Sequence, residues 1–430
     1  NDKEFLHAFF AHMVDINHKD TLLRIDSPDL EKWLQECAAT SSQSDLLWNY
    51  YIIQGKHFQA GEQAWKVATS QTDDIHLNSR IEYLVRAGDA FGMAMQSADQ
   101  SYGAMQWNAS GSLPAHHNRE EVARNELSVR ETLSVTRIQS RILHRAQNSK
   151  YELPPEDLNQ LSFTLVAVSD LYNKYAAPLD MYDICLIILH TCRHDERETI
   201  EELWKSVLCE EIMPCNTRDD GIFMVLRELA EGSHTNEPAI RLLDGGAVAN
   251  DRSTPLFEDG IWLKKLEGRV GSLGKELFGT GADYIFPVDF LMSWLEKLHR
   301  VMSNAVPSSS NNADWIFTLL INAGVPYMTT LDGYDRIIEG EDHAVMGGLM
   351  SDRRVRHFAS IIGMLEGWVK EANQAAYGAE NAAAIQLSDA LATGAFSRRL
   401  ESYKAQLRTL PEAHTVDARF DALQRFIGRL

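Results

Sequence analysis

The sequence predicts an all-α fold, an elongated and irregular α-solenoid of stacked antiparallel helices. Three observations favour it. Apolar residues recur at helical spacing in nearly every segment, convincing alternation of apolar and polar residues at period two is missing, and residue pairs that close β-hairpins are scarce. At the usual length of a helix and its loop, the 430 residues accommodate roughly eighteen to twenty helices.

The clearest helix near the N-terminus is predicted to begin at Pro28. Ser27 is suited to cap this helix, and the fixed φ angle of Pro28 suits the first helical position. The residues of its apolar face follow at steps of three, one, three and one: Leu30, Trp33, Leu34, Cys37 and Ala38.

Two further helices are predicted in the middle of the chain. Pro154 and Pro155 open the first, whose apolar residues alternate at steps of three and four and form a narrow seam for a neighbouring helix. These residues are Leu158, Leu161, Leu165, Val168, Tyr172 and Tyr175. Thr199 and Glu202 have the spacing of a capping box at the start of the second. Its apolar face contains Ile200, Leu203, Trp204, Val207 and Leu208.

The same pattern returns in the C-terminal part of the chain. Pro287 starts a helix in which Asp289 near the beginning and His299 and Arg300 toward the end match the helix dipole. Its apolar residues are Leu291, Trp294, Leu295, Leu298, Val301 and Met302. A last apolar stripe consists of Val416, Phe420, Leu423, Ile427 and Leu430.

We expect one continuous helical solenoid over residues 1–430, with 1–150, 151–250 and 251–430 as loose sub-blocks. Polar, Gly- or Pro-rich breaks occur at 108–118, 146–155, 244–256 and 303–313. Each of these breaks is too short for a flexible interdomain linker and indicates a longer loop between helices. Tetratricopeptide and ankyrin signatures are missing, which favours irregular repeats. The chain lacks an initial Met, so we expect a piece excised from a longer protein.

The charge balance disfavours a nucleic-acid partner. Lys and Arg total 41 and Asp and Glu total 61, which gives a formal net charge of −20. Phosphate binding needs a cationic face, and the densest basic cluster, Arg353, Arg354 and Arg356, is predicted to be a solvated helix face. No apolar run approaches the roughly 18 residues of a membrane span.

The five cysteines indicate neither a disulfide scaffold nor a metal site. They form no CxxC pair, and the odd, sparse count favours a reducing compartment. Cys185 lies on an apolar helix face, so core packing is the preferred interpretation. The cysteines are Cys37, Cys185, Cys192, Cys209 and Cys215. We predict no metal site and no cofactor.

Catalytic motifs are also missing from the sequence. The Gly-rich stretch 268–275 resembles a phosphate-binding loop but has Arg269 and Glu276 at two required positions, so we expect a turn between helices there. The Asp-Asp-x-x-Asp motif of helical isoprenoid synthases is not completed at Asp73-Asp74 or Asp219-Asp220. No nucleophile, base and orienting group can be nominated, and no catalytic residue is predicted.

Nine Trp and thirteen Tyr residues suggest grooves between helices in which an extended peptide could dock. We predict a peptide-docking region where aromatic residues are dense and Pro- and Gly-containing turns interrupt the helices. Its residues are Phe290, Trp294, Trp315, Tyr327 and Tyr334. Core packing is the competing interpretation for each of them.

Several collinear stretches resemble one protein family. The stretch 171–190, LYNKYAAPLDMYDICLIILH, is similar to a helix-loop-helix of the large inner-ring scaffold nucleoporins, the propeller-plus-solenoid proteins of the one-fifty-five/one-seventy class. Similar stretches occur at 4–10 with 22–30, at 45–51, at 286–291, and at 324–328 with 334–335. Together they span roughly 4–338, and beyond 339 only helical periodicity remains.

The resemblance implies the C-terminal solenoid of such a nucleoporin, of fungal type, without the N-terminal propeller. It implies a non-enzymatic scaffold of the inner ring of the nuclear pore complex, located at the nuclear envelope and supporting nucleocytoplasmic transport. The partners implied are other inner-ring nucleoporins, notably a linear segment of an FG-repeat linker nucleoporin. The family's membrane-sensing element lies in the propeller, so no membrane contact is expected from this chain.

Two alternatives remain open from the sequence. A different helical-repeat scaffold, such as a vesicle-coat subunit, would have the same pattern. An all-α enzyme would have a deep pocket with clustered carboxylates. If the chain is a docking scaffold, its negative charge favours a basic segment, with binding that weakens as salt is added.

Overall fold

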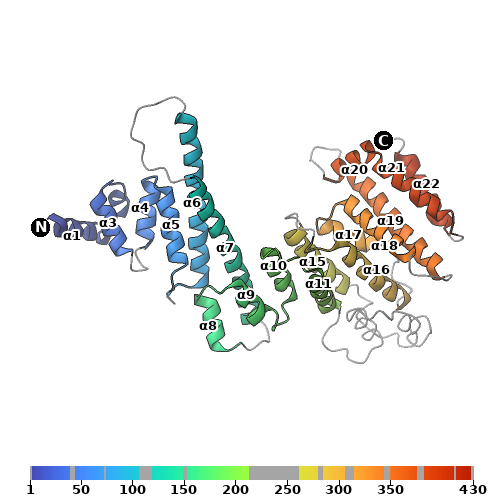
Figure 1. The fold of residues 1–430 in the computed structure, drawn as a ribbon, viewed down its shortest axis with the longest axis horizontal. Helices are drawn as coiled ribbons and strands as arrows, with labels where there is room; N and C mark the ends of the chain where they lie inside the picture. Colours follow the sequence, from blue (N-terminus) through green and yellow to red (C-terminus); the bar gives the residue numbers. More distant parts are fainter. Residues whose placement is uncertain are drawn as a thin grey trace. The chain divides into compact units, whose positions relative to one another are not determined.

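We analysed the protein through a computed structural model, in which the regular elements of the described residues are all helical (Figure 1). The structure describes residues 2–38, 44–71, 74–105, 119–148, 153–212, 261–278, 284–305, 314–342, 349–374, 382–410 and 413–427. The predicted all-α class is therefore confirmed for these ranges. The predicted breaks at 108–118 and 244–256, and the residues Cys215 and Leu430, lie outside them.

The chain divides into two compact units, Asn1–Thr191 and Cys192–Leu430. Within each unit, most helices pack against the next helix along the chain or against the one after it. This nearest-neighbour packing is the arrangement of a helical solenoid. The expectation of one continuous solenoid over 1–430, with its three sub-blocks, stays a prediction.

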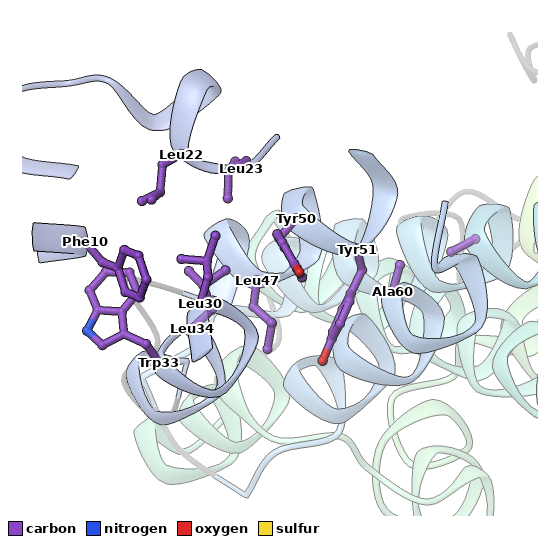
Figure 2. Packing of buried hydrophobic residues seen from close by; sticks show 11 residues of the cluster. Phe10, Leu22, Leu23, Leu30, Trp33, Leu34, Leu47, Tyr50, Tyr51 and Ala60 are labelled. Carbon is purple, nitrogen blue, oxygen red and sulfur yellow. The ribbon is translucent and has the colours of Figure 1, made fainter. Parts of the chain in front are cut away.

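Unit 1 begins with five helices that share one hydrophobic core (Figure 2). These helices are α1 (Asp2–Asp15), α2 (Lys19–Leu22), α3 (Pro28–Cys37), α4 (Ser44–Ile53) and α5 (His57–Ala68). As predicted, α3 begins at Pro28, and Ser27 before it has extended backbone angles, although its hydroxyl makes no capping hydrogen bond. Leu30, Leu34 and Tyr50 in this core are fully buried.

Two long helices continue unit 1, α6 (Leu77–Met105) and α7 (Arg119–Asn148), and they pack side by side (Figure 1). Phe91 of α6 and Val129 of α7 are fully buried in a second core that also includes Phe58 of α5. Unit 1 ends with four shorter elements: α8 (Pro155–Phe163), α9 (Val168–Asp170), the π-helix η2 (Leu171–Ala176) and α10 (Tyr182–Thr191).

The prediction of a single helix that begins at Pro155 and continues to Tyr175 is wrong. Helix α8 ends at Phe163, and helical structure resumes only at Val168. The cause is the fully buried side chain of Gln139 on α7. Its Nε2 donates to the carbonyls of Leu161 and Thr164, at 2.8 and 2.7 Å, and its Oε1 accepts from the N–H of Val166 at 3.0 Å. One amide therefore satisfies three backbone groups that a continuous helix would have paired internally.

Arg80 on α6 also binds the chain at the end of α8, where the helix is interrupted. Its side chain is buried and donates to four backbone carbonyls at 2.7–3.2 Å, those of Ala68, Ser70, Ile75 and Phe163. One guanidinium thus joins the end of α5, the segment before α6 and the end of α8. Carbonyl oxygens have partial negative charge, so these four acceptors stabilise the buried guanidinium.

Unit 2 is a second stack of helices. In chain order these are α11 (Arg197–Ile212), α15 (Ile261–Leu277), α16 (Val288–Ala305), α17 (Asp314–Asn322), α18 (Tyr327–Asp342), α19 (Leu349–Gln374), α20 (Ala382–Ala392), α21 (Ala395–Leu407) and α22 (His414–Ile427). The fully buried aromatic residues Trp204, Trp368 and Phe420 mark its core. The indole N–H of Trp204 donates to the carbonyl of Ile285, and that of Trp368 to the carbonyl of Ala383.

Two predicted boundaries in unit 2 are wrong. Helix α11 begins at Arg197, so Thr199 lies in its first turn, where its hydroxyl donates to the carboxylate of Glu196. The Gly-rich stretch 268–275 is part of helix α15 and is not a turn. A Cβ atom on Gly274 would collide with Ala323, so this glycine permits the close approach of the chain at the end of α17.

Candidate docking surfaces

The aromatic residues predicted to bind a peptide lie on three consecutive helices of unit 2. Trp294 of α16 and Tyr327 and Tyr334 of α18 are buried, whereas Phe290 of α16 and Trp315 of α17 are half-buried. Their role in docking stays a prediction, and the burial of Trp294, Tyr327 and Tyr334 is that of core residues.

Among the residues that the structure describes, hydrogen bonds, ring stacking or a cation–π contact involve four of these five side chains. The Tyr327 ring stacks on Trp368, with centroids 4.9 Å apart, and its hydroxyl donates to Glu371 at 2.5 Å. Burial and this carboxylate raise the pKa of the Tyr327 phenol. The Tyr334 hydroxyl donates to Glu296 at 2.8 Å, and the ammonium of Lys205 lies 5.8 Å from the ring centre of Phe290. The indole N–H of Trp315 donates to Nδ1 of His299 at 2.9 Å.

His299 is a neutral acceptor in this arrangement. Its pKa is lowered, first by burial and then by Arg356, whereas Glu296 opposes the shift. Its Nδ1 can accept the Trp315 hydrogen bond only when that nitrogen carries no proton. The contact between α16 and α17 therefore depends on the protonation state of one imidazole.

We expect unit 2 to lose stability as the pH falls through the titration range of histidine. Between the lowered folded pKa of His299 and the ordinary value of about 6.5, the unfolded chain binds a proton that the folded chain does not, so acid favours unfolding. Thermal melts from pH 7.5 to pH 5 should show a falling Tm, and His299→Gln should have a smaller fall. An equal fall in both proteins would exclude His299 as a contributor.

A large groove lies in unit 1, over α4 and between α3 and α5. It has a volume of about 1250 Å³. Leu47 and Tyr51 of α4 are buried members of the first core, which Figure 2 shows. They also line the groove and form its apolar floor. One face each of α3 and α5 forms the walls, and Thr69, Ser70, Asp74 and Ile75, which follow α5, also line the groove. The lining residues outside the floor include Glu31, Gln35, Ala38, Gln59, Glu62, Gln63, Trp65, Lys66, Thr69, Ser70 and Asp74.

Sequence reasoning missed this groove for a physical reason. Its walls are polar residues at steps of three and four, such as Gln59, Gln63 and Lys66 on α5, which is also the pattern of an ordinary solvated helix face. Nothing in the pattern shows that two such faces converge over a third helix. The groove would be found only by knowing how α3 and α5 pack on α4.

A smaller groove of about 470 Å³ lies between α19 and α22 in unit 2. Val369, Leu423 and the 46%-exposed Phe426 give it an apolar floor. Lys370 and Asn373 lie at its edge, together with Glu366, which forms an ion pair with Arg419 at 2.6 Å.

Two of the cysteines in the described residues, Cys185 and Cys209, have the properties of core residues, whereas Cys37 is half-buried and Cys192 is exposed. Cys185 and Cys209 are buried, and this burial raises the pKa of Cys185 to about 12 and that of Cys209 to about 11. In the described part of the chain, no group of three or more His, Cys, Asp or Glu side chains could hold a metal ion. A search of the same residues finds no helix long and apolar enough to span a bilayer.

Comparison with known proteins relates this helical stack to nucleoporins. A probable nucleoporin of Schizosaccharomyces pombe is 29% identical over 214 residues, which cover 48% of this chain and 14% of that protein. Nucleoporin NUP170 of Chaetomium thermophilum is 23% identical over 381 residues, which cover 86% of this chain and 23% of that protein. The chain therefore spans less than a quarter of the length of either relative.

The fold is that of a solved nucleoporin domain. The crystal structure of the Chaetomium thermophilum Nup170 CTD in complex with Nup145N superposes with a TM-score of 0.67 and 18% sequence identity, over 99% of this chain and 70% of that chain. The α-solenoid fold predicted from the sequence is thereby confirmed. Residues 1–409 match the family described as non-repetitive/WGA-negative nucleoporin C-terminal, and because this match covers nearly the whole sequence, the chain belongs to that nucleoporin family.

Proposed function

We propose that this chain is a non-enzymatic scaffold of the nuclear pore complex, which supports nucleocytoplasmic transport by docking a linear segment of another nucleoporin on its solenoid surface. The family match over residues 1–409 is the observation that carries this proposal. The Nup170 CTD of Chaetomium thermophilum was solved with a nucleoporin partner, Nup145N, so a domain of the same fold binds another nucleoporin.

The structure is suited to docking in two respects. Helical stacks expose long surfaces, and grooves between helices can accept the anchor residues of an otherwise disordered segment. Two such grooves are present in the described residues, one in each unit. We propose a segment of an FG-repeat linker nucleoporin as the ligand and one continuous solenoid over 1–430 as the platform.

Titration with labelled linker segments of inner-ring nucleoporins tests this function directly. We expect saturable binding of one short segment, weaker at high salt than at low salt, because the chain carries a net charge of −20. Failure of every nucleoporin linker to bind the folded chain would contradict the proposal. Saturable binding of vesicle-coat segments in their place would favour the other scaffold class.

A further inference from the structure

The groove between α19 and α22 is lined by one stripe of residues from each helix. Glu366, Val369 and Asn373 line it from α19 at steps of three and four. Leu423 and Phe426 line it from α22 at a step of three. Residues at these spacings lie on one face of a helix. The two helices pack against each other in unit 2 (Figure 1), so the two stripes form one groove.

Apolar side chains form the floor of this groove, and one of them is left exposed. Val369 and Leu423 are buried, whereas Phe426 is 46% exposed. A ligand that covers an exposed aromatic ring removes apolar surface from water, which is the main favourable contribution to most protein association. Phe426 is therefore the side chain on which a ligand would gain most.

The size of the groove fits a few side chains of a partner better than a second copy of the chain. Its volume is about 470 Å³, and seven of the described residues line it. A stable interface between two proteins uses about 20–30 residues on each side. A dimer held by this groove alone would be too small, whereas a short segment with two or three anchor residues needs no larger surface.

The lining favours a helical ligand over an extended one. Both walls are helices, which pair most of their main-chain groups internally and offer few partners to the backbone of a ligand. The polar side chains of the lining are only those of Glu366, Lys370 and Asn373. An extended segment over the apolar floor would leave backbone groups unpaired, whereas a helix pairs its own.

Lys370 gives the groove a charge preference. Its side chain is exposed and forms no ion pair with any residue that the structure describes. The carboxylate of Glu366 is instead paired with Arg419, whose Nη2 and Nε lie 2.6 and 3.2 Å from its two oxygens. The uncompensated charge of the lining is therefore positive. The net charge of −20 acts on a ligand as a whole, whereas Lys370 acts on the ligand position beside it.

We propose that the groove between α19 and α22 binds an amphipathic helix of a partner nucleoporin, with apolar anchors on Val369, Leu423 and Phe426 and an Asp or Glu beside Lys370. This inference rests on the proposed function, because it assigns one docking site to the nucleoporin segment. The residues of the site are different from the five of the predicted aromatic region.

Two labelled peptides of about 18 residues, long enough to form a helix, serve as probes for the full chain. They have the same apolar residues at steps of three and four. They differ at one flanking position, which is Glu in one peptide and Lys in the other. We expect the Glu peptide to bind the wild-type chain about threefold or more tightly than the Lys peptide at low salt, with a smaller preference at high salt.

Reversing the charge on the protein tests the position of that contact. Lys370→Glu should reverse the preference, so that the Lys peptide binds more tightly. Lys265→Glu on α15 is the matched control, because it makes the same change in net charge at an exposed lysine that does not line the groove. It should keep the preference of wild type. Equal effects of the two substitutions would overturn the assignment, because they would show a general charge effect.

The apolar contact is tested at Phe426. Phe426→Ala should weaken binding of the Glu peptide about fivefold or more. Ile385→Ala, at an exposed apolar residue of α20 outside the lining, should change it by less than about twofold. Both side chains are exposed, so both variants should fold, which circular dichroism and thermal melts verify. Equal losses in the two variants would contradict an anchor at Phe426.

Two further results would overturn the inference. One is failure of the Glu peptide to bind the folded wild-type chain. The other is a concentration-dependent dimer that Phe426→Ala abolishes, which would make the occupant a second copy. If nucleoporin linkers bind wild type and Phe426→Ala alike, the groove inference fails and the proposed function stands. If no linker binds but the Glu peptide binds in the groove, the proposed function fails and the preference of the groove for an acidic amphipathic helix stands.

Discussion

Replacing Arg80 with Met is expected to lower the free energy of unfolding of unit 1 by about 3–5 kcal/mol. Met matches the length of the aliphatic part of the side chain but donates no hydrogen bond. The carbonyls of Ala68, Ser70, Ile75 and Phe163 would then lose their guanidinium donor. Each buried carbonyl left without a partner carries a desolvation cost.

The measurement is chemical denaturation of the full chain, followed with a probe that reports on unit 1. Arg130→Met on α7 is the matched control, because this arginine is 72% exposed and forms an i,i+4 ion pair with Glu126. Loss of this ion pair should lower the free energy of unfolding by about 0.5 kcal/mol or less. Equal destabilisation by the two substitutions would show that Arg80 does not hold the chain segments together.

The sequence is sufficient to predict the fold class, but it is not sufficient to predict where the helices are interrupted. Helical periodicity continues through Leu161, Leu165 and Val168, yet the helix stops between them. The deciding interactions come from Gln139 and Arg80, distant in sequence and on other helices. A local apolar pattern indicates which residues prefer a core. It does not indicate that a side chain from a distant helix will compete for the backbone hydrogen bonds.

Site prediction was limited by the same lack of three-dimensional information. Aromatic density identified a region of unit 2 in which Trp294, Tyr327 and Tyr334 are buried, because large apolar residues are used for cores and for binding surfaces alike. The groove over α4 has walls of Gln, Glu and Lys, which local composition does not distinguish from solvated surface. Finding a groove requires the packing of helices, whereas composition gives only the chemistry of each helix face.

Trp294 allows the packing and docking roles of the aromatic region to be separated. Its side chain is 3% exposed, so Trp294→Ala should lower the free energy of unfolding by about 3–5 kcal/mol through the cavity that it leaves. Trp294→Phe should lower the free energy of unfolding by far less than Trp294→Ala does. The indole N–H of Trp294 is buried without a hydrogen-bond partner among the residues that the structure describes, so Phe retains most of the apolar contact and removes an unsatisfied donor.

Trp204 is the matched comparison for this substitution. Its indole N–H donates to the carbonyl of Ile285 at 2.8 Å, so Trp204→Phe leaves a buried acceptor unpaired and should cost about 1–3 kcal/mol more than Trp294→Phe. Denaturation measures these differences, and titration with a nucleoporin linker measures the role in docking. If Trp294→Phe folds like wild type but loses linker binding, Trp294 contributes to docking. If it binds normally while Trp294→Ala unfolds, the aromatic region is core, and the docking surface has to be sought in the grooves.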